Sequence, residues 1–126
     1  WARHFFVSAG VALMSTESVS DAAGLLKEEL DAGEGGSGFS FGDLAADRAG
    51  TTFALAATRN EAAARAMQDR ITRGFREEDF LPPVEDLPEG LSDAEFTARY
   101  GGVHGEGYRK LMAEIERRIA ECPAYR

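Results

Sequence analysis

The stretch GEGGSGFSFGDLAAD, residues 33–47, lies between two segments of helical composition and decides how the chain folds. Its glycines predict the end of the first of these helices, because glycine adopts left-handed dihedral angles at little cost. Ser40 is suited to cap the next helix, with Asp43 in the first turn, where a negative charge interacts favourably with the helix dipole. The stretch therefore predicts a tight corner that folds the third helix back toward the start of the chain.

The same glycines match the dinucleotide-binding pattern G-x-G-x-x-G at Gly33, Gly35 and Gly38. That pattern indicates a nucleotide site only where it follows a buried strand and opens a crossover helix. Here it follows LLKEELDA, which has helical composition and period, and Glu34 would bring a negative charge to the phosphate site. No lysine followed by serine or threonine completes a P-loop. We therefore expect no nucleotide and no other cofactor.

Every apolar segment of the chain has the period of a helix, and no run of alternating β-branched residues predicts a strand. A chain of 126 residues is long enough to bury a core of its own. The sequence therefore predicts an all-α fold, a single compact domain of five or six helices with a proline-rich surface connector. Its expected parts are helices at 2–14, 18–32 and 41–57, a fourth helix within 58–75, the acidic connector 76–91 and C-terminal helices within 92–122.

The apolar positions indicate which helix faces pack inward. The first helix is apolar nearly all round, which predicts that it is covered on most sides. In the last helix, Ile115 lies in the middle of an apolar stripe and is expected in the core. The second helix divides into an apolar stripe of Ala23, Leu26 and Leu30 and an opposite flank of Gly24, Lys27, Glu28 and Asp31. The connector is expected to pack through Phe80, Leu81, Val84 and Leu87.

The chain is acidic, with a formal net charge of −8 at pH 7. An acidic surface disfavours nucleic acid and anionic membranes, so we expect no nucleic-acid partner. The apolar run FFVSAGVALM, residues 5–14, is too short to span a bilayer, and no cleavage site of a signal peptide follows it. We expect no transmembrane span in these residues. Cys122 is the only cysteine, so the chain forms no internal disulfide.

Three groups of polar residues are candidates for a site. His4 and Ser8 lie one turn apart on the first helix, and Asp43 and Asp47 share a face of the third. A histidine among apolar residues needs a polar partner, so we expect the glycine corner to bring the two aspartates to face His4 and Ser8. The third group is Lys27, Glu28 and Asp31, which would balance the charge of this network.

Each group also has a plain structural explanation. The histidine can be a core residue bonded to a backbone carbonyl, the aspartates a solvated helix face, and Lys27 with Asp31 an exposed ion pair. A histidine with several carboxylates is also compatible with a metal, but no tight ligand spacing such as H-E-x-x-H is present, and we expect no metal site. His104, within GGVHGEG, is expected in a solvated turn, and no nucleophile elbow supports a Ser-His-Asp triad.

Three motifs carry a resemblance to a known family: HFFVS, GLLKEELD and GGSGFSFGDLAADRAG, which begin at residues 4, 24 and 35. In this order they resemble the YfiM-like family of predicted bacterial envelope lipoproteins. They are more distantly similar to VanZ-like membrane proteins, which also pair an early His-Phe with a late aspartate and a helix glycine. The matching positions are His4, Phe5, Ser8, Lys27, Glu28, Asp31, the turn 36–40 with Ser37, and Asp43, Asp47 and Gly50. The resemblance covers residues 4–57 and implies a periplasmic or cell-envelope location and a polar cluster.

These observations lead to three hypotheses for function. The first is a non-enzymatic, envelope-associated helical domain whose polar cluster holds three helices in register or binds a small ligand. The alternative is a hydrolase or transferase that uses His4 with Asp47 or Asp43 as an acid–base pair and Lys27 as an anion anchor. The third is an interaction module built from the connector and the last helix. A solvent-reachable cleft would favour the enzyme, and a closed, mutually bonded cluster the structural role.

Overall fold

The computed structural model describes residues 1–15, 17–33, 36–74 and 76–126, and within these ranges every regular element is helical. The predicted all-α single domain is therefore confirmed. The helices are α1 (Ala2–Met14), α2 (Glu17–Ala32), α3 (Phe41–Thr58), α4 (Glu61–Arg73), α5 (Asp93–Tyr100) and α6 (Glu106–Glu121), with short 3-10 turns η1 (Glu77–Asp79) and η2 (Gly102–His104).

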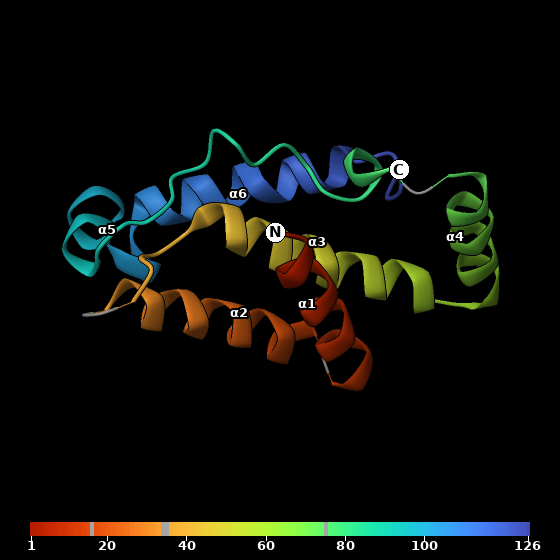
Figure 1. Cartoon of the computed structure of the whole chain (residues 1–126), viewed down its shortest axis with the longest axis horizontal. Helices are drawn as coiled ribbons and strands as arrows, with labels where there is room; N and C mark the ends of the chain where they lie inside the picture. The colour runs from red at the N-terminus through yellow and green to blue at the C-terminus, as the bar shows by residue number, and fades with distance from the viewer. Residues whose placement is uncertain (16, 34–35, 75) are drawn as a thin grey trace.

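The helix α3 runs through the middle of the molecule and contacts α1, α2, α4 and α6 (Figure 1). Figure 1 shows α2 along one side of α3, and α6 with the connector along the other. The sequence of α3 explains its central position, since Ala45, Ala46 and Ala49 are fully buried and let neighbouring helices come close. At Gly50 a Cβ atom would lie 2.0 Å from the carbonyl oxygen of Phe5, so the backbones of α1 and α3 touch there.

The glycine corner connects α2 to α3 and is described except for residues 34 and 35, which include Gly35 of the G-x-G-x-x-G pattern. Gly38 has a positive φ of 92°, and its N–H donates to the carbonyl oxygen of Asp31 at the end of α2. Ser40 caps α3 as predicted, with its hydroxyl accepting the N–H of Asp43 at 3.0 Å. The chain thus turns directly from the end of α2 into α3, and the two helices pack against each other.

The other side of α3 is covered by α6 and the connector 76–91, and α5 packs against α6 and α2. Ile115 is fully buried, as its place in the apolar stripe of α6 predicts. The predicted anchors of the connector, Phe80, Leu81, Val84 and Leu87, are all buried. Arg118 of α6 holds the connector from outside through hydrogen bonds to the carboxylate of Asp86 and the carbonyl of Pro83. This half of the molecule contains most of the apolar core.

The prediction that α1 is covered on most sides is wrong. Phe6 and Val7 are each 58% exposed, Leu13 is 60% exposed and Met14 is 91% exposed. Only the opposite face, with Phe5, Ser8, Ala9 and Ala12, is buried. The composition of α1 is apolar on both faces, and composition alone does not indicate that only one of them has a neighbour.

The orientation of α2 is also the reverse of what its apolar stripe suggests. Leu26 and Leu30 of that stripe are exposed, whereas Glu28 on the opposite flank is fully buried. A Cβ atom at Gly24 would lie 3.0 Å from a carboxylate oxygen of Asp47, so the polar flank of α2 faces α3. The usual rule fails here because it assumes an apolar interior, while the interface between α1, α2 and α3 contains a polar cluster.

Candidate functional site

The centre of this polar cluster is the imidazole of His4, which enters from the first turn of α1. Its Nδ1 lies 3.3 Å from Oδ2 of Asp47, and its Nε2 lies 3.2 Å from Oδ2 of Asp43. The two aspartates are one turn apart on α3, so a single helix face presents both carboxylates to one ring. The corner geometry predicts this meeting. The Asp47 side chain is 8% exposed and that of Asp43 is 29% exposed, which excludes a fully solvated aspartate face as the explanation.

Asp47 is the buried acceptor of the cluster. Its Oδ1 accepts a hydrogen bond of 2.8 Å from the hydroxyl of Ser8, one turn along α1 from His4. Its Oδ2 contacts the imidazole of His4, so both carboxylate oxygens have a partner on α1. Gly24 of α2 packs against the same carboxylate, because it lacks a side chain that would push the helices apart. Asp47 therefore lies where α1, α2 and α3 meet.

Glu28 of α2 is fully buried and connects α2 to the start of α3. Its Oε2 accepts the backbone N–H of Ser40 at 2.8 Å, and its Oε1 accepts from Nζ of Lys27 at 3.0 Å. Burial raises the pKa of the Glu28 carboxyl, while the bonds from Ser40 and Lys27 act in the opposite direction. The sequence predicts Ser40 as a helix cap but does not predict that its backbone N–H donates to Glu28. The available signal for this bond is that the first backbone N–H groups of a helix have no partner within the helix and donate to one from outside.

Lys27, Asp31 and Ser37 form the outer edge of the cluster. Burial lowers the pKa of the Lys27 ammonium, but its bonds to Asp31 and Glu28 outweigh this and raise it. The pKa of Asp31 is lowered, mainly by its bond to Lys27 and also by a hydrogen bond from Ser37. The Lys27 side chain is 38% exposed, so the ion pair with Asp31 is partly solvated while the bond to Glu28 points inward.

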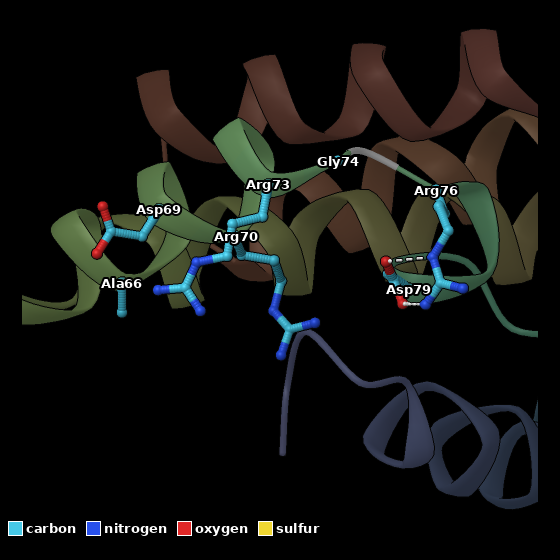
Figure 2. A pocket seen from close by; sticks show the side chains of 7 residues that line it. All are labelled: Ala66, Asp69, Arg70, Arg73, Gly74, Arg76 and Asp79. Atoms are coloured by element: carbon cyan, nitrogen blue, oxygen red, sulfur yellow. Dashed lines mark hydrogen bonds and ion pairs between the residues drawn. The ribbon is translucent and has the colours of Figure 1, made fainter.

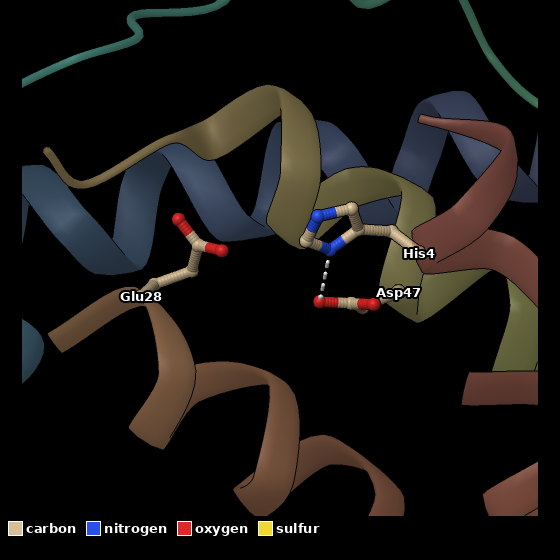
Figure 3. Close-up of side chains that lie close together, drawn as sticks. All are labelled: His4, Glu28 and Asp47. Carbon is tan, nitrogen blue, oxygen red and sulfur yellow. Dashed lines mark hydrogen bonds and ion pairs between the residues drawn. The ribbon is translucent and has the colours of Figure 1, made fainter. Parts of the chain in front are cut away.

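The eight candidate residues therefore all belong to this polar cluster. His4 and Ser8 come from α1, Lys27, Glu28 and Asp31 from α2, Ser37 from the corner, and Asp43 and Asp47 from α3. Three of them, His4, Glu28 and Asp47, bring one nitrogen and two carboxylate oxygens within 4.8 Å of one another (Figure 3). Each of the three comes from a different helix and points toward the other two (Figure 3).

Solvent reaches the polar cluster through a small pocket of about 140 Å³. The pocket is lined by Arg3, His4, Val7, Ser8, Val11, Ala23, Gly24, Lys27 and Asp47. In a Ser-His-Asp relay the serine hydroxyl donates to the imidazole, which the aspartate orients. Here the hydroxyl of Ser8 donates to the carboxylate of Asp47. The serine thus stabilises the carboxylate in the position that it occupies beside His4.

A wider groove of about 470 Å³ lies between the end of α4 and η1 (Figure 2). Arg70, Arg73 and Arg76 line it together with Asp69 and Asp79. The guanidinium of Arg76 donates two hydrogen bonds to the carboxylate of Asp79, as Figure 2 shows. Arg70 and Arg73 lie in the last turn of α4, where positive charge interacts favourably with the helix dipole. These interactions are local to α4 and η1.

Comparison with protein-family models, with curated proteins and with solved structures finds no match for this chain. The resemblance to the YfiM-like family therefore remains an expectation from the sequence. Among the described residues, no helix combines the length and the apolar character needed to cross a membrane. Fold and site together define a small all-α domain with a polar cluster enclosed by three helices.

Proposed function

We propose that the protein is a non-enzymatic, envelope-associated helical domain in which the polar cluster fixes α1 and α2 on α3. The observation that carries this proposal is the pairing of Asp47, whose two carboxylate oxygens contact Ser8 and His4. On the α2 side of the polar cluster, both carboxylate oxygens of Glu28 accept hydrogen bonds, one from Ser40 and one from Lys27. A buried carboxylate bonded at both oxygens holds its neighbours in one arrangement, because any other would leave a charge unpaired.

The composition of this interface explains why it needs directional bonds. Small residues, Gly50 and Ala54 of α3 with Ala9 and Ala12 of α1, let the two helices approach closely but offer few interdigitating side chains. Close contact between smooth helix surfaces does not by itself select one register, whereas buried polar groups can specify one. The bonds of Asp47 to Ser8 and His4 of α1, and of Glu28 to the backbone N–H of Ser40 at the start of α3, supply that selection.

The proposed envelope association rests on the family resemblance and on the outward faces of α1 and α2. These faces carry exposed apolar residues, namely Phe6, Val7, Leu13 and Met14 on α1 and Leu26 and Leu30 on α2. Because the net charge is −8, an uncharged lipid surface suits them better than an anionic one. Co-sedimentation with phosphatidylcholine vesicles tests this association, and Leu13→Glu should lower the fraction of protein that sediments with the vesicles. If neither the wild type nor Leu13→Glu sediments with the vesicles, the proposed association is contradicted.

An acid–base role for His4 is the second candidate, and the pocket that reaches His4, Lys27 and Asp47 favours it. Its weakness is that Lys27, the proposed anion anchor, is already bonded to Glu28 and Asp31. Turnover of nitrophenyl ester or phosphate substrates tests this candidate. Activity that Asp47→Asn abolishes in a folded protein would favour the enzyme over the structural role.

The experiment that tests the structural role is urea unfolding of Asp47→Asn in buffer with a chelator. The substitution preserves the shape of the side chain but removes the negative charge that Ser8 and His4 contact. The free energy of unfolding should therefore fall by about 1–3 kcal/mol. Asp69→Asn is the matched control, because Asp69 is an exposed aspartate on α4. Equal stability of Asp47→Asn and the wild type would contradict the proposal.

A further inference from the structure

We propose that the polar cluster binds one divalent transition-metal ion through His4, Glu28 and Asp47. This inference names the ligand of the site whose structural role is proposed above, and it rests on that role. The three side chains come from α1, α2 and α3, so a shared ion would connect all three helices at one point (Figure 3). The sequence did not predict this site, because its ligands lie far apart in the chain and show no local spacing.

The distances within the cluster fit a small cation. Ligands at 2.0–2.1 Å from a tetrahedral ion lie roughly 3.3 Å from one another. The Nδ1 atom of His4 and Oδ2 of Asp47 are 3.3 Å apart. A charge-assisted hydrogen bond between such groups is usually shorter, about 2.7–2.9 Å. The Glu28 oxygen lies within 4.8 Å of both, so a shift of at most about 1.5 Å brings it to the roughly 3.3 Å spacing of a shared coordination sphere.

Each proposed ligand is already oriented by a second group. The Nε2 atom of His4 faces Asp43 at 3.2 Å, which leaves Nδ1 to coordinate an ion. Such a carboxylate behind the imidazole is the usual partner of a metal-bound histidine. Ser8 donates to Oδ1 of Asp47 and leaves Oδ2 toward His4. The third ligand, Glu28, is held through Oε2 by the N–H of Ser40. The cluster thus has the supported donors that metal sites require.

The charge of the cluster also favours a cation. Four carboxylates gather here, those of Glu28, Asp31, Asp43 and Asp47. Against them stand the ammonium of Lys27, the guanidinium of Arg3 at the edge of the pocket, and an imidazole that carries at most one positive charge. Negative charge is therefore in excess, and two of the carboxylates are buried. A divalent ion offsets this excess at the buried carboxylates, where the removal of negative charge from water costs the most free energy.

The donor set selects the class of ion. One imidazole nitrogen with carboxylate oxygens suits Zn²⁺ and neighbouring transition metals, whereas Mg²⁺ and Ca²⁺ prefer sites made only of oxygen. Lys27 competes for Oε1 of Glu28, at 3.0 Å. Its side chain is partly exposed and also bonded to Asp31, so it can turn outward and keep that pair when an ion enters.

The test is isothermal titration calorimetry of the full chain with zinc chloride, after removal of metal by a chelator. We expect one Zn²⁺ per chain, and about a tenfold or larger loss of affinity in Glu28→Gln and in His4→Gln. The matched controls are Glu29→Gln, an exposed carboxylate on the same helix, and His104→Gln, the other histidine. Both controls should bind as the wild type does, and magnesium chloride should give no comparable binding.

Lys27→Met keeps the three ligands and removes the competing ammonium, so it should bind Zn²⁺ more tightly than the wild type. This variant tests the proposal even if Glu28→Gln does not fold, which circular dichroism would reveal. Absence of stoichiometric Zn²⁺ binding to the folded wild type would overturn the inference. Equal loss in the control variants, or weaker binding by Lys27→Met, would also overturn it. The unfolding of Asp47→Asn in chelator tests the structural role separately, since no metal is present.

Discussion

Gly50 lies where the backbone of α1 touches α3, and Gly50→Ala probes that contact with a single methyl group. The added Cβ would lie 2.0 Å from the carbonyl oxygen of Phe5 and 2.8 Å from its carbonyl carbon. Ordinary contact begins at 3.4 Å, so the helices must separate by about 1.4 Å. The atoms that clash belong to the backbone, and no side-chain rotation relieves them.

Two effects of opposite sign decide the outcome. Alanine is favoured over glycine inside a helix by about 1 kcal/mol. Overpacking of a tight interface typically costs about 1–3 kcal/mol, and here the separation would also lengthen the 3.3 Å contact between His4 and Asp47 beyond bonding distance. We therefore expect Gly50→Ala to lower the free energy of unfolding by about 1–3 kcal/mol despite its better helix propensity.

Gly10→Ala is the matched control, since a Cβ at Gly10 in α1 would have no neighbour within 4 Å. This change should stabilise the protein by about 0.5–1 kcal/mol, the helix-propensity gain alone. Chemical unfolding followed by circular dichroism measures both variants. Equal stabilisation by Gly50→Ala and Gly10→Ala would refute the close contact of α1 with α3, and with it the geometry of the polar cluster.

Further predictions concern the apolar core, the surface ion pairs and the glycine corner. Ile115→Ala should lower the free energy of unfolding by about 2–5 kcal/mol in a urea titration, because Ile115 is fully buried; a loss near zero would place α6 outside the core. Hydrogen bonds from Arg117 and Arg118 lower the pKa of Glu114 to about 2, below its ordinary 4.5. The ionised Glu114 carboxylate therefore stabilises the fold above pH 4.5, and the Tm difference between the wild type and Glu114→Gln should shrink as the pH falls toward 2; a constant difference would contradict this prediction. NAD or ATP at millimolar concentration should leave the Tm unchanged, because the corner is a turn and not a phosphate site; a clear rise would refute this interpretation.

The helices and their ends were predictable because the signals are local. Ser40 at the start of α3 and Ser92 at the start of α5 both cap their helices with the side-chain bonds that such residues favour. The buried connector anchors and Ile115 followed from apolar spacing, since that half of the molecule has an ordinary apolar core. In this part of the chain, local pattern and tertiary packing agree.

The orientation of α1 and α2 was not predictable from the same rules. Glu28 is buried while Leu26 and Leu30 on the other flank are exposed, because the neighbours of α2 are polar. Such an arrangement depends on which residues of distant segments meet, and helix period carries no information about that. The meeting of His4 with Asp47 was predictable because a buried histidine needs a partner, whereas the contribution of Glu28 to the same centre appears only in three dimensions.

The bonds of Asp47 to His4 and Ser8 are proposed to hold α1 on α3. A double-mutant cycle of His4→Ala and Asp47→Ala, measured by urea unfolding in chelator, tests this proposal most directly. We predict a coupling free energy of about 0.5–3 kcal/mol, the range for residues in contact within one network. The exposed pair Glu61 and Arg65 on α4 supplies the reference, with about 0.2–0.5 kcal/mol expected. A coupling of His4 with Asp47 that is indistinguishable from zero would contradict the account.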